Sequence, residues 1–218
     1  MSTTASRATI WILVTSAFAA LNFYALSNRS DRDQDVVYEY DLLAGAVFAY
    51  GLLFVFVLAI TSGLPRREAL GLRPPESWWK AVALSLGSVV VIFVGAAIVL
   101  SVLGAGDEQN LAPEDWDGSR AGAYAASFLA IVFIGPTVEE LLYRGAGMSL
   151  LAPYGSWVAV AATAVLFGLG HGLLLSLGAF IWFGLVIGVL RLRTGSLYPA
   201  IFAHSLFNAV GMIGPLVV

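Results

Sequence analysis

Long apolar segments alternate with short polar connections along most of this chain. A helix needs about 20 mostly apolar residues to cross the hydrocarbon core of a bilayer. Segments that reach or approach this length cover residues 8–27, 41–61, 78–104, 121–146, 156–175, 176–192 and 196–217. The last three are crowded, with only a tight turn near Ser176. The pattern predicts an all-α fold, a polytopic membrane bundle of about seven transmembrane helices, or eight if one long segment is broken.

Composition indicates the same class of protein. The chain is 59% hydrophobic and 11% charged, whereas soluble domains carry roughly 25% charged residues. No soluble domain is visible, so we expect a single integral membrane domain over residues 1–218. A net charge of −3 without a basic run indicates no nucleic-acid partner. The absence of cysteine excludes disulfides, thiol nucleophiles and cysteine-ligated metals.

The first apolar segment has a second interpretation, a signal peptide with an Ala-Phe-Ala cleavage site. We favour an uncleaved helix, because the apolar stretch continues through residues 21–26 and reaches spanning length.

Basic residues in the connections predict the orientation. With the N-terminus inside, the inner side carries Arg7, Arg66, Arg67, Arg73, Lys80, Arg191 and Arg193. The outer side carries Arg29, Arg32 and Arg120, diluted by acidic clusters at 31–41 and 107–117. This bias predicts a cytoplasmic N-terminus, in a multi-pass protein that we assign to the bacterial cell membrane.

Three ionisable residues interrupt the apolar segment near its centre: Glu139, Glu140 and Arg144. Placing each of them at mid-membrane costs roughly 2.5–3.5 kcal/mol of insertion free energy, unless the side chain is ion-paired or lines a water-filled cavity. Glu140 and Arg144 stand at i, i+4 in the favourable order, so a structural ion pair explains them. Glu139 lies about 100° further round the helix and has no local partner. Pro136 predicts a kink or a new segment, and thereby a wet cavity beside Glu139.

The chain's two histidines lie in other apolar segments. His171 follows Phe167 by one helical turn, and His204 shares a helix face with Asn208. A lone intramembrane histidine or asparagine is often an interhelical hydrogen bond worth under about 2 kcal/mol. Two histidines together with a spare carboxylate instead favour a functional site. We therefore expect Glu139, His171, His204 and Asn208 to converge from three helices.

These residues also carry a resemblance to a known family. The stretches EELLYR (139–144), FGLGH (167–171) and HSLFN (204–208) resemble the motifs EExxxR, FxxxH and HxxxN. Those are the motifs of the CPBP family, the CAAX protease and bacteriocin-processing intramembrane proteases. The segments ALGLRPP (69–75) and TGSLYPAIFAH (194–204) are also similar to that family.

The resemblance implies hydrolysis of a peptide bond within the membrane by a motif-bearing catalytic core over residues 121–210. Glu139 would be the general base, and His171 would help to hold and activate the water. His204 and Asn208 would donate hydrogen bonds to the oxyanion of the tetrahedral intermediate. Site-shaping or substrate-binding roles are implied for Glu140, Arg144 and Phe167.

A metal-dependent version of this reaction stays open. Glu139, His171 and His204 would form a His₂Glu zinc set. We favour catalysis without a cofactor. If Glu139 were a metal ligand, Glu140 would have to be the base, and the pairing of Glu140 with Arg144 already accounts for that residue. The sequence contains no HExxH motif.

Two further classes of function stay open. A proton-coupled carrier also uses intramembrane acids and histidines, although no internal repeat is visible. A non-enzymatic immunity or regulatory protein would keep the motifs for binding only. If the protein is an enzyme, its expected partners are the lipid bilayer and a peptide or protein substrate. A lipidated substrate would suit the apolar bundle.

Overall fold

The computed structural model describes residues 3–28, 36–104, 113 and 116–214, and its fold is all-helical there. The separate helices are α1 (Thr3–Ser27), α2 (Tyr40–Ile60), α3 (Arg66–Ala69), α4 (Trp78–Leu103), α8 (Ser156–Gly170), α9 (Leu177–Thr194) and α10 (Tyr198–Ile213). A short 3-10 turn, η1 (Val36–Tyr38), precedes α2.

One long helical stretch, residues 118–154, changes its winding several times. Its parts are η2 (Gly118–Arg120), α5 (Ala121–Leu129), the π-helical η3 (Ala130–Ile134), α6 (Gly135–Glu140), the π-helical η4 (Leu141–Gly147), α7 (Met148–Leu151) and η5 (Ala152–Tyr154). It lies at the centre of the bundle, in contact with α1, α2, α8 and α10.

Each of the seven apolar segments expected from the sequence contains a helix. Within the described residues, five stretches are long and apolar enough to cross a membrane: Thr4–Ser27, Tyr40–Ile60, Trp78–Leu103, Gly118–Tyr154 and Leu177–Thr194. α8 has 15 residues and α10 has 16, so five spans are supported and the number seven stays a prediction. Arg29, Arg32 and parts of both acidic clusters lie outside the described residues.

The expected helix over 156–175 was too long, since α8 ends at Gly170. Gly172 has a φ of +69°, the left-handed conformation that commonly stops a helix. A side chain at this position would also collide with the backbone of α1 at Asn22 and Phe23. Close approach of α1 therefore helps to fix the end of α8.

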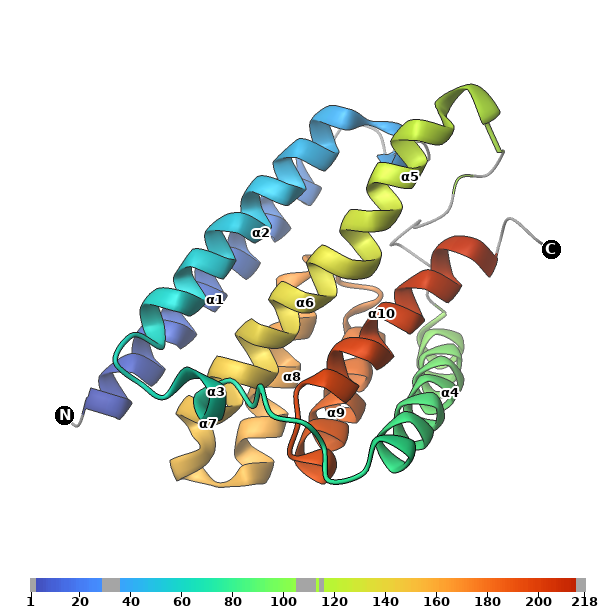
Figure 1. Ribbon diagram of the computed structural model, residues 1–218. Helices are drawn as coiled ribbons and strands as arrows, with labels where there is room; N and C mark the ends of the chain where they lie inside the picture. The colour runs from blue at the N-terminus through green and yellow to red at the C-terminus, as the bar shows by residue number, and fades with distance from the viewer. Residues whose placement is uncertain (1–2, 29–35, 105–112, 114–115, 215–218) are drawn as a thin grey trace.

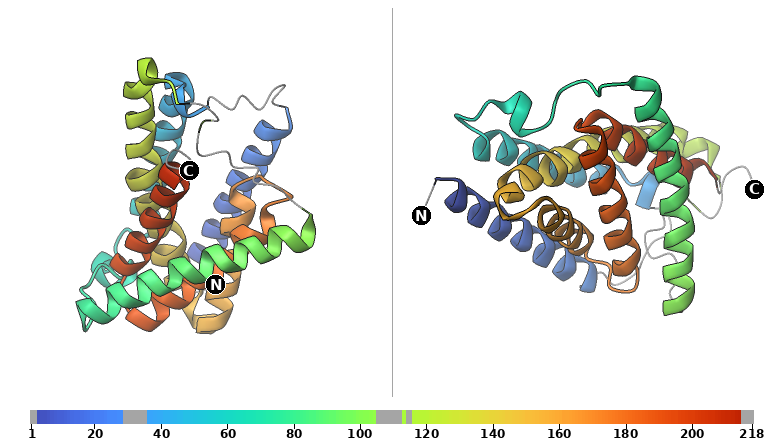
Figure 2. Two further views of the ribbon diagram at one scale, coloured as in Figure 1. Left: turned by 90° about the vertical axis from the view of Figure 1, so that its right-hand side faces the viewer. Right: turned by 90° about the horizontal axis from the view of Figure 1, so that it is seen from below.

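The helices are not all parallel. α1 packs on α7 and α8, while α9 lies between α8 and α4. α4 crosses the direction of α2 and α5 at a steep angle, as the left view of Figure 2 shows. The start of α1, the short α3, the start of α4 and the α9–α10 connection all lie at one end of the bundle (Figure 1). Most of the basic residues assigned to the inner side belong to these segments, and the orientation itself stays a prediction.

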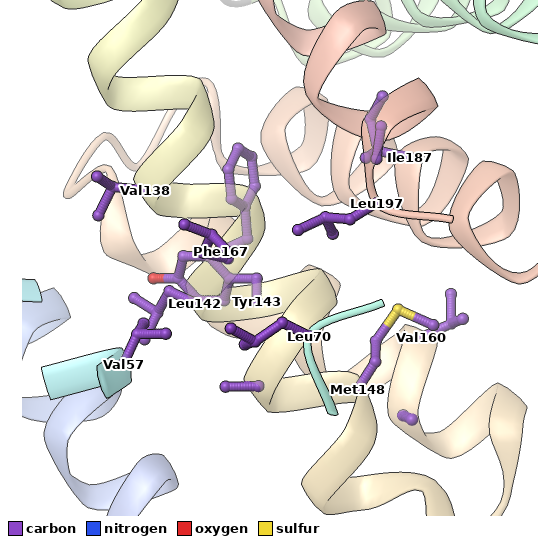
Figure 3. Packing of buried hydrophobic residues seen from close by; sticks show 14 of the residues in the cluster. Val57, Leu70, Val138, Leu142, Tyr143, Met148, Val160, Phe167, Ile187 and Leu197 are labelled. Carbon is purple, nitrogen blue, oxygen red and sulfur yellow. The ribbon is translucent and has the colours of Figure 1, made fainter. Parts of the chain in front are cut away.

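The main hydrophobic core lies around the central stretch. Leu142, Phe167 and Ile187 come from η4, α8 and α9 and are buried there together with Leu197 of the α9–α10 connection (Figure 3). From α1, Trp11 adds a fully buried ring whose Nε1 donates to the Leu142 carbonyl at 3.0 Å. The first helix is thus an integral part of the core.

α8 and α9 approach each other closely at Gly184, where a Cβ atom would lie 2.8 Å from the Ala164 Cα. We expect Gly184→Ala to lower the free energy of unfolding by about 1–3 kcal/mol, because two backbones would have to separate. Gly87→Ala in α4 is the matched control, since nothing lies within 4 Å of its Cβ position. Thermal unfolding in detergent would show a lower Tm for the first variant only. Equal Tm values for both variants would contradict this packing.

Candidate active site

The central helical stretch, residues 118–154, changes from α-helical to π-helical winding just before the acidic residues. Pro136 lacks an N–H, and its ring crowds the carbonyl four residues earlier in a regular helix. The structure meets this demand with the π-helical η3, after which α6 begins at Gly135. The Ile131 carbonyl in η3 accepts a hydrogen bond from Asn208 Nδ2 at 2.8 Å. The break expected from Pro136 is therefore present, and it helps to anchor α10 beside α6.

Glu139 has partners on two other helices. The Tyr50 hydroxyl of α2 donates to Glu139 Oε1 at 3.0 Å. Glu139 Oε2 lies 3.8 Å from His204 Nε2 of α10. The Glu139 side chain keeps 16% of its surface exposed, so water can reach it. The inference that Glu139 faces something outside its own helix is confirmed.

Glu140 and Arg144 form the predicted ion pair, with Arg144 Nη1 donating to Glu140 Oε1 at 3.0 Å and both side chains fully buried. The pair is part of a larger network. His204 Nδ1 donates to the same Glu140 oxygen at 2.9 Å, and Arg144 Nη2 donates to the Gly184 carbonyl at 3.1 Å. The Arg144 guanidinium also lies 4.5 Å from the centre of the Phe167 ring. Because the Arg144 side chain is fully buried by these contacts, it has no exposed surface that a substrate could touch. This favours its site-shaping role.

His171 directly follows the last residue of α8. Its Nδ1 donates to the Phe167 carbonyl at 2.9 Å, which leaves Nε2 as the nitrogen for other partners. The ring stacks on Phe180, with centroids 3.9 Å apart, and contacts the Phe167 edge at 4.7 Å. Glu139 and His204 are both close enough to influence it electrostatically. Its orientation is thus fixed by one hydrogen bond and two aromatic rings.

A cavity of about 680 Å³ collects these groups. Glu139, His171, His204 and Asn208 all line it, whereas Glu140 and Arg144 do not. Phe167 contributes a wall close to the two histidines. The rest of the wall is mostly apolar and comes from α1, α2, α4, α9 and α10. The structure therefore brings the four expected catalytic side chains into one partly polar pocket.

The zinc alternative concerns Glu139, His171 and His204, which all line the cavity. Among the described residues, no group of three histidine or acidic side chains is arranged to hold a metal ion. Each histidine does direct its Nδ1 proton to a fixed acceptor, a carbonyl or a carboxylate, as metal-binding histidines also do. Both histidines thus keep Nε2 for another partner, and the choice between the metal-free and the zinc-dependent mechanism stays a prediction.

Comparison with known families gives one match. Residues 121–210 match the type II CAAX prenyl endopeptidase Rce1-like family. This region is an Rce1-like CAAX prenyl endopeptidase domain. The family is one of hydrolases, so this domain is placed among enzymes. No curated protein and no solved structure was found to match the chain.

Parts of the pocket lie outside the Rce1-like domain. α1, α2 and α4 contribute cavity walls, and α2 contributes Tyr50, which the sequence analysis did not select. The sequence feature that could have indicated Tyr50 is a phenol within an apolar segment. A buried hydroxyl usually requires a hydrogen-bond partner. Tyrosine is common in such segments, so its partner could not be identified from sequence.

Proposed function

We propose that this protein is an intramembrane endopeptidase in which Glu139 activates a water molecule to hydrolyse a peptide bond. The observation that supports the proposal is the convergence of four polar side chains on one cavity. Glu139 comes from α6, His171 from the end of α8, and His204 and Asn208 from α10. The Rce1-like domain containing all four supports the same reaction class.

The spacing of the polar atoms suits one water molecule. Glu139 Oε2 and His204 Nε2 are 3.8 Å apart, too far for a direct hydrogen bond and suitable for a bridging water. Glu139 would take a proton from this water as the oxygen attacks the carbonyl carbon. His171 would hold the water from the other side of the pocket through its Nε2.

The attack produces an oxyanion, which needs donors aimed at it. Asn208 gives one amide hydrogen to the Ile131 carbonyl and keeps the second for this purpose. His204 can donate through Nε2 when both ring nitrogens carry protons, since Nδ1 is already given to Glu140. Collapse of the intermediate breaks the C–N bond, and protonated Glu139 returns the proton to the leaving amine.

The substrate we propose is a membrane-associated peptide or protein, lipidated or hydrophobic. The largely apolar cavity wall supports this class, because such walls bind apolar chains. A reporter peptide presented in proteoliposomes, with and without a lipid group, would test the proposal. The account requires cleavage by the wild type and loss of cleavage in a folded His171→Ala variant. Proton flux without cleavage would instead identify a carrier, and neither activity would identify a binding protein.

Tyr50 would act as a positioning residue for Glu139. We expect Tyr50→Phe to lower kcat about 10-fold with little change in KM, because one hydrogen bond fixing the base is lost. Tyr40→Phe is the matched control, since Tyr40 begins the same helix and is exposed. Steady-state cleavage kinetics would check this. A purely structural role would instead change thermal stability and leave kcat of the folded fraction unaltered.

We propose that the reaction needs no metal cofactor. Cleavage is therefore expected to persist within about twofold after exhaustive treatment with a strong chelator, since no catalytic step uses a metal Lewis acid. The measurement is initial rate before chelation, after it, and after adding zinc back. Complete loss that only zinc restores would replace this mechanism with the zinc-dependent version.

A further inference from the structure

A second polar cluster lies at the end of the bundle where α3 leads to α4 and α9 leads to α10 (Figure 1). It joins residues 71–73 to residues 195–197, to which the proposed reaction gives no role. Arg73 Nε donates to the Gly195 carbonyl at 2.8 Å, and Ser196 Oγ donates to the Arg73 carbonyl at 2.6 Å. A backbone bond from Leu197 to Gly71 at 2.9 Å completes the connection. The two segments are thus held in a fixed arrangement.

This arrangement brings two positive charges together. Arg191, in the last turn of α9, lies so close to Gly71 that any side chain there would collide with its guanidinium. Arg73 lies against Gly195 in the same way, with a Cβ position 3.2 Å from Arg73 Nη2. The two charges are close enough to repel each other. Both glycines have a positive φ, +67° at Gly71 and +62° at Gly195, and their lack of a side chain also leaves room for the two guanidinium groups.

Nothing in the described part of the chain neutralises this pair. Its ion pairs involve other residues, and the linker carboxylates Glu68 and Glu76 contact neither arginine as salt-bridge partners. Arg191 Nε is buried without a hydrogen-bond partner. Two neighbouring guanidinium groups without a counter-charge among the described residues suit a phosphate, because each guanidinium can bind phosphate oxygens through two N–H donors.

Aromatic side chains beside the pair indicate its depth in the membrane. Trp78, Trp79 and Tyr198 are all exposed, and the Trp78 and Tyr198 rings stack with centroids 6.3 Å apart. Lys80 lies 5.7 Å from the Trp79 ring. Exposed tryptophan and tyrosine gather at the level of the lipid headgroups, and lysine side chains reach toward the same layer. The arginine pair therefore lies where headgroup phosphates are found.

We propose that Arg73 and Arg191 bind the phosphate of an anionic phospholipid headgroup. Basic pockets between transmembrane helices bind such headgroups through the combined attraction of a few cations. The site is separate from the catalytic cavity, which neither arginine lines. Its occupation would neutralise the repulsion between α9 and the α3–α4 linker.

Native mass spectrometry of the full chain in detergent, with phosphatidylglycerol or phosphatidylcholine added, tests the proposal. We expect the R73Q/R191Q variant to bind phosphatidylglycerol about 10-fold more weakly than the wild type. R66Q/R67Q is the matched control, since both arginines are exposed on the neighbouring α3 and donate only to nearby carbonyls. It should stay within about twofold of the wild type. Arg73→Gln alone, at an exposed position, gives a second variant should the double change prevent folding.

Three results would overturn the proposal. Equal losses in the two double variants would show a diffuse charge effect. Equal binding of the two lipids would show that the anionic headgroup is not selected. Displacement of phosphatidylglycerol by millimolar inorganic phosphate would assign the site to a free anion. None of these results depends on peptide cleavage, so the proposed protease activity is tested separately.

Discussion

Glu139→Gln is expected to lower kcat for reporter cleavage about 10³-fold while the protein stays folded. Glutamine has the shape of glutamate and can still accept the Tyr50 hydrogen bond through its amide oxygen. It cannot take a proton from water, so the attack on the carbonyl loses its base. Single-turnover cleavage in proteoliposomes measures this loss directly, because it isolates the chemical step from product release.

Glu68→Gln is the matched control for that change. Glu68 is exposed on α3 and forms no ion pair with another described residue. Its replacement should leave both cleavage and thermal unfolding unaltered. A Glu139→Gln protein that cleaves within about 10-fold of the wild-type rate would remove Glu139 as the general base.

Arg144→Met is expected to have the largest effect on stability. It would leave the fully buried Glu140 carboxylate without its guanidinium, and breaking a buried ion pair typically costs 3–5 kcal/mol. Arg120→Gln provides the comparison, because its pair with Glu39 is partly exposed and exposed pairs contribute only about 0–1 kcal/mol. Thermal unfolding in detergent should show a large loss of Tm for the first variant and little change for the second.

A double replacement separates stability from catalysis at this network. Glu140→Leu together with Arg144→Met removes both buried charges, and such apolar replacements often restore stability. Activity should nevertheless stay low, because His204 Nδ1 would lose the acceptor that fixes its ring. Recovery of full activity along with Tm would show that Glu140 does not orient His204.

The sequence predicted the helical class and the pairing of Glu140 with Arg144 because both depend on local pattern. Apolar length predicts a helix in lipid, and i, i+4 spacing alone places two side chains together. The convergence of Glu139 with His204 was inferred from the cost of leaving either one unpaired. That reasoning identifies residues needing partners, and the structure then supplies the geometry.

The features that the sequence did not predict depend on contacts between distant segments. The end of α8 at Gly170 reflects the approach of α1 to Gly172, 150 residues from Asn22. Tyr50 reaches Glu139 only because α2 packs on α6. The shared use of the Glu140 carboxylate by Arg144 and His204 likewise requires α10 beside α6. Local spacing carries no information about such neighbours.

Oxygen transfer from labelled water tests the hydrolytic centre most directly. The reporter is incubated with wild-type protein in ¹⁸O-water, and the new C-terminal carboxylate is weighed by mass spectrometry. A proton-abstracting Glu139 in the common cavity predicts one ¹⁸O atom per cleavage with the wild type, and about 10³-fold less labelled product in the same time with Glu139→Gln. Cleavage that incorporates no ¹⁸O, or labelled product formed by Glu139→Gln at the wild-type rate, would contradict a water molecule activated by Glu139.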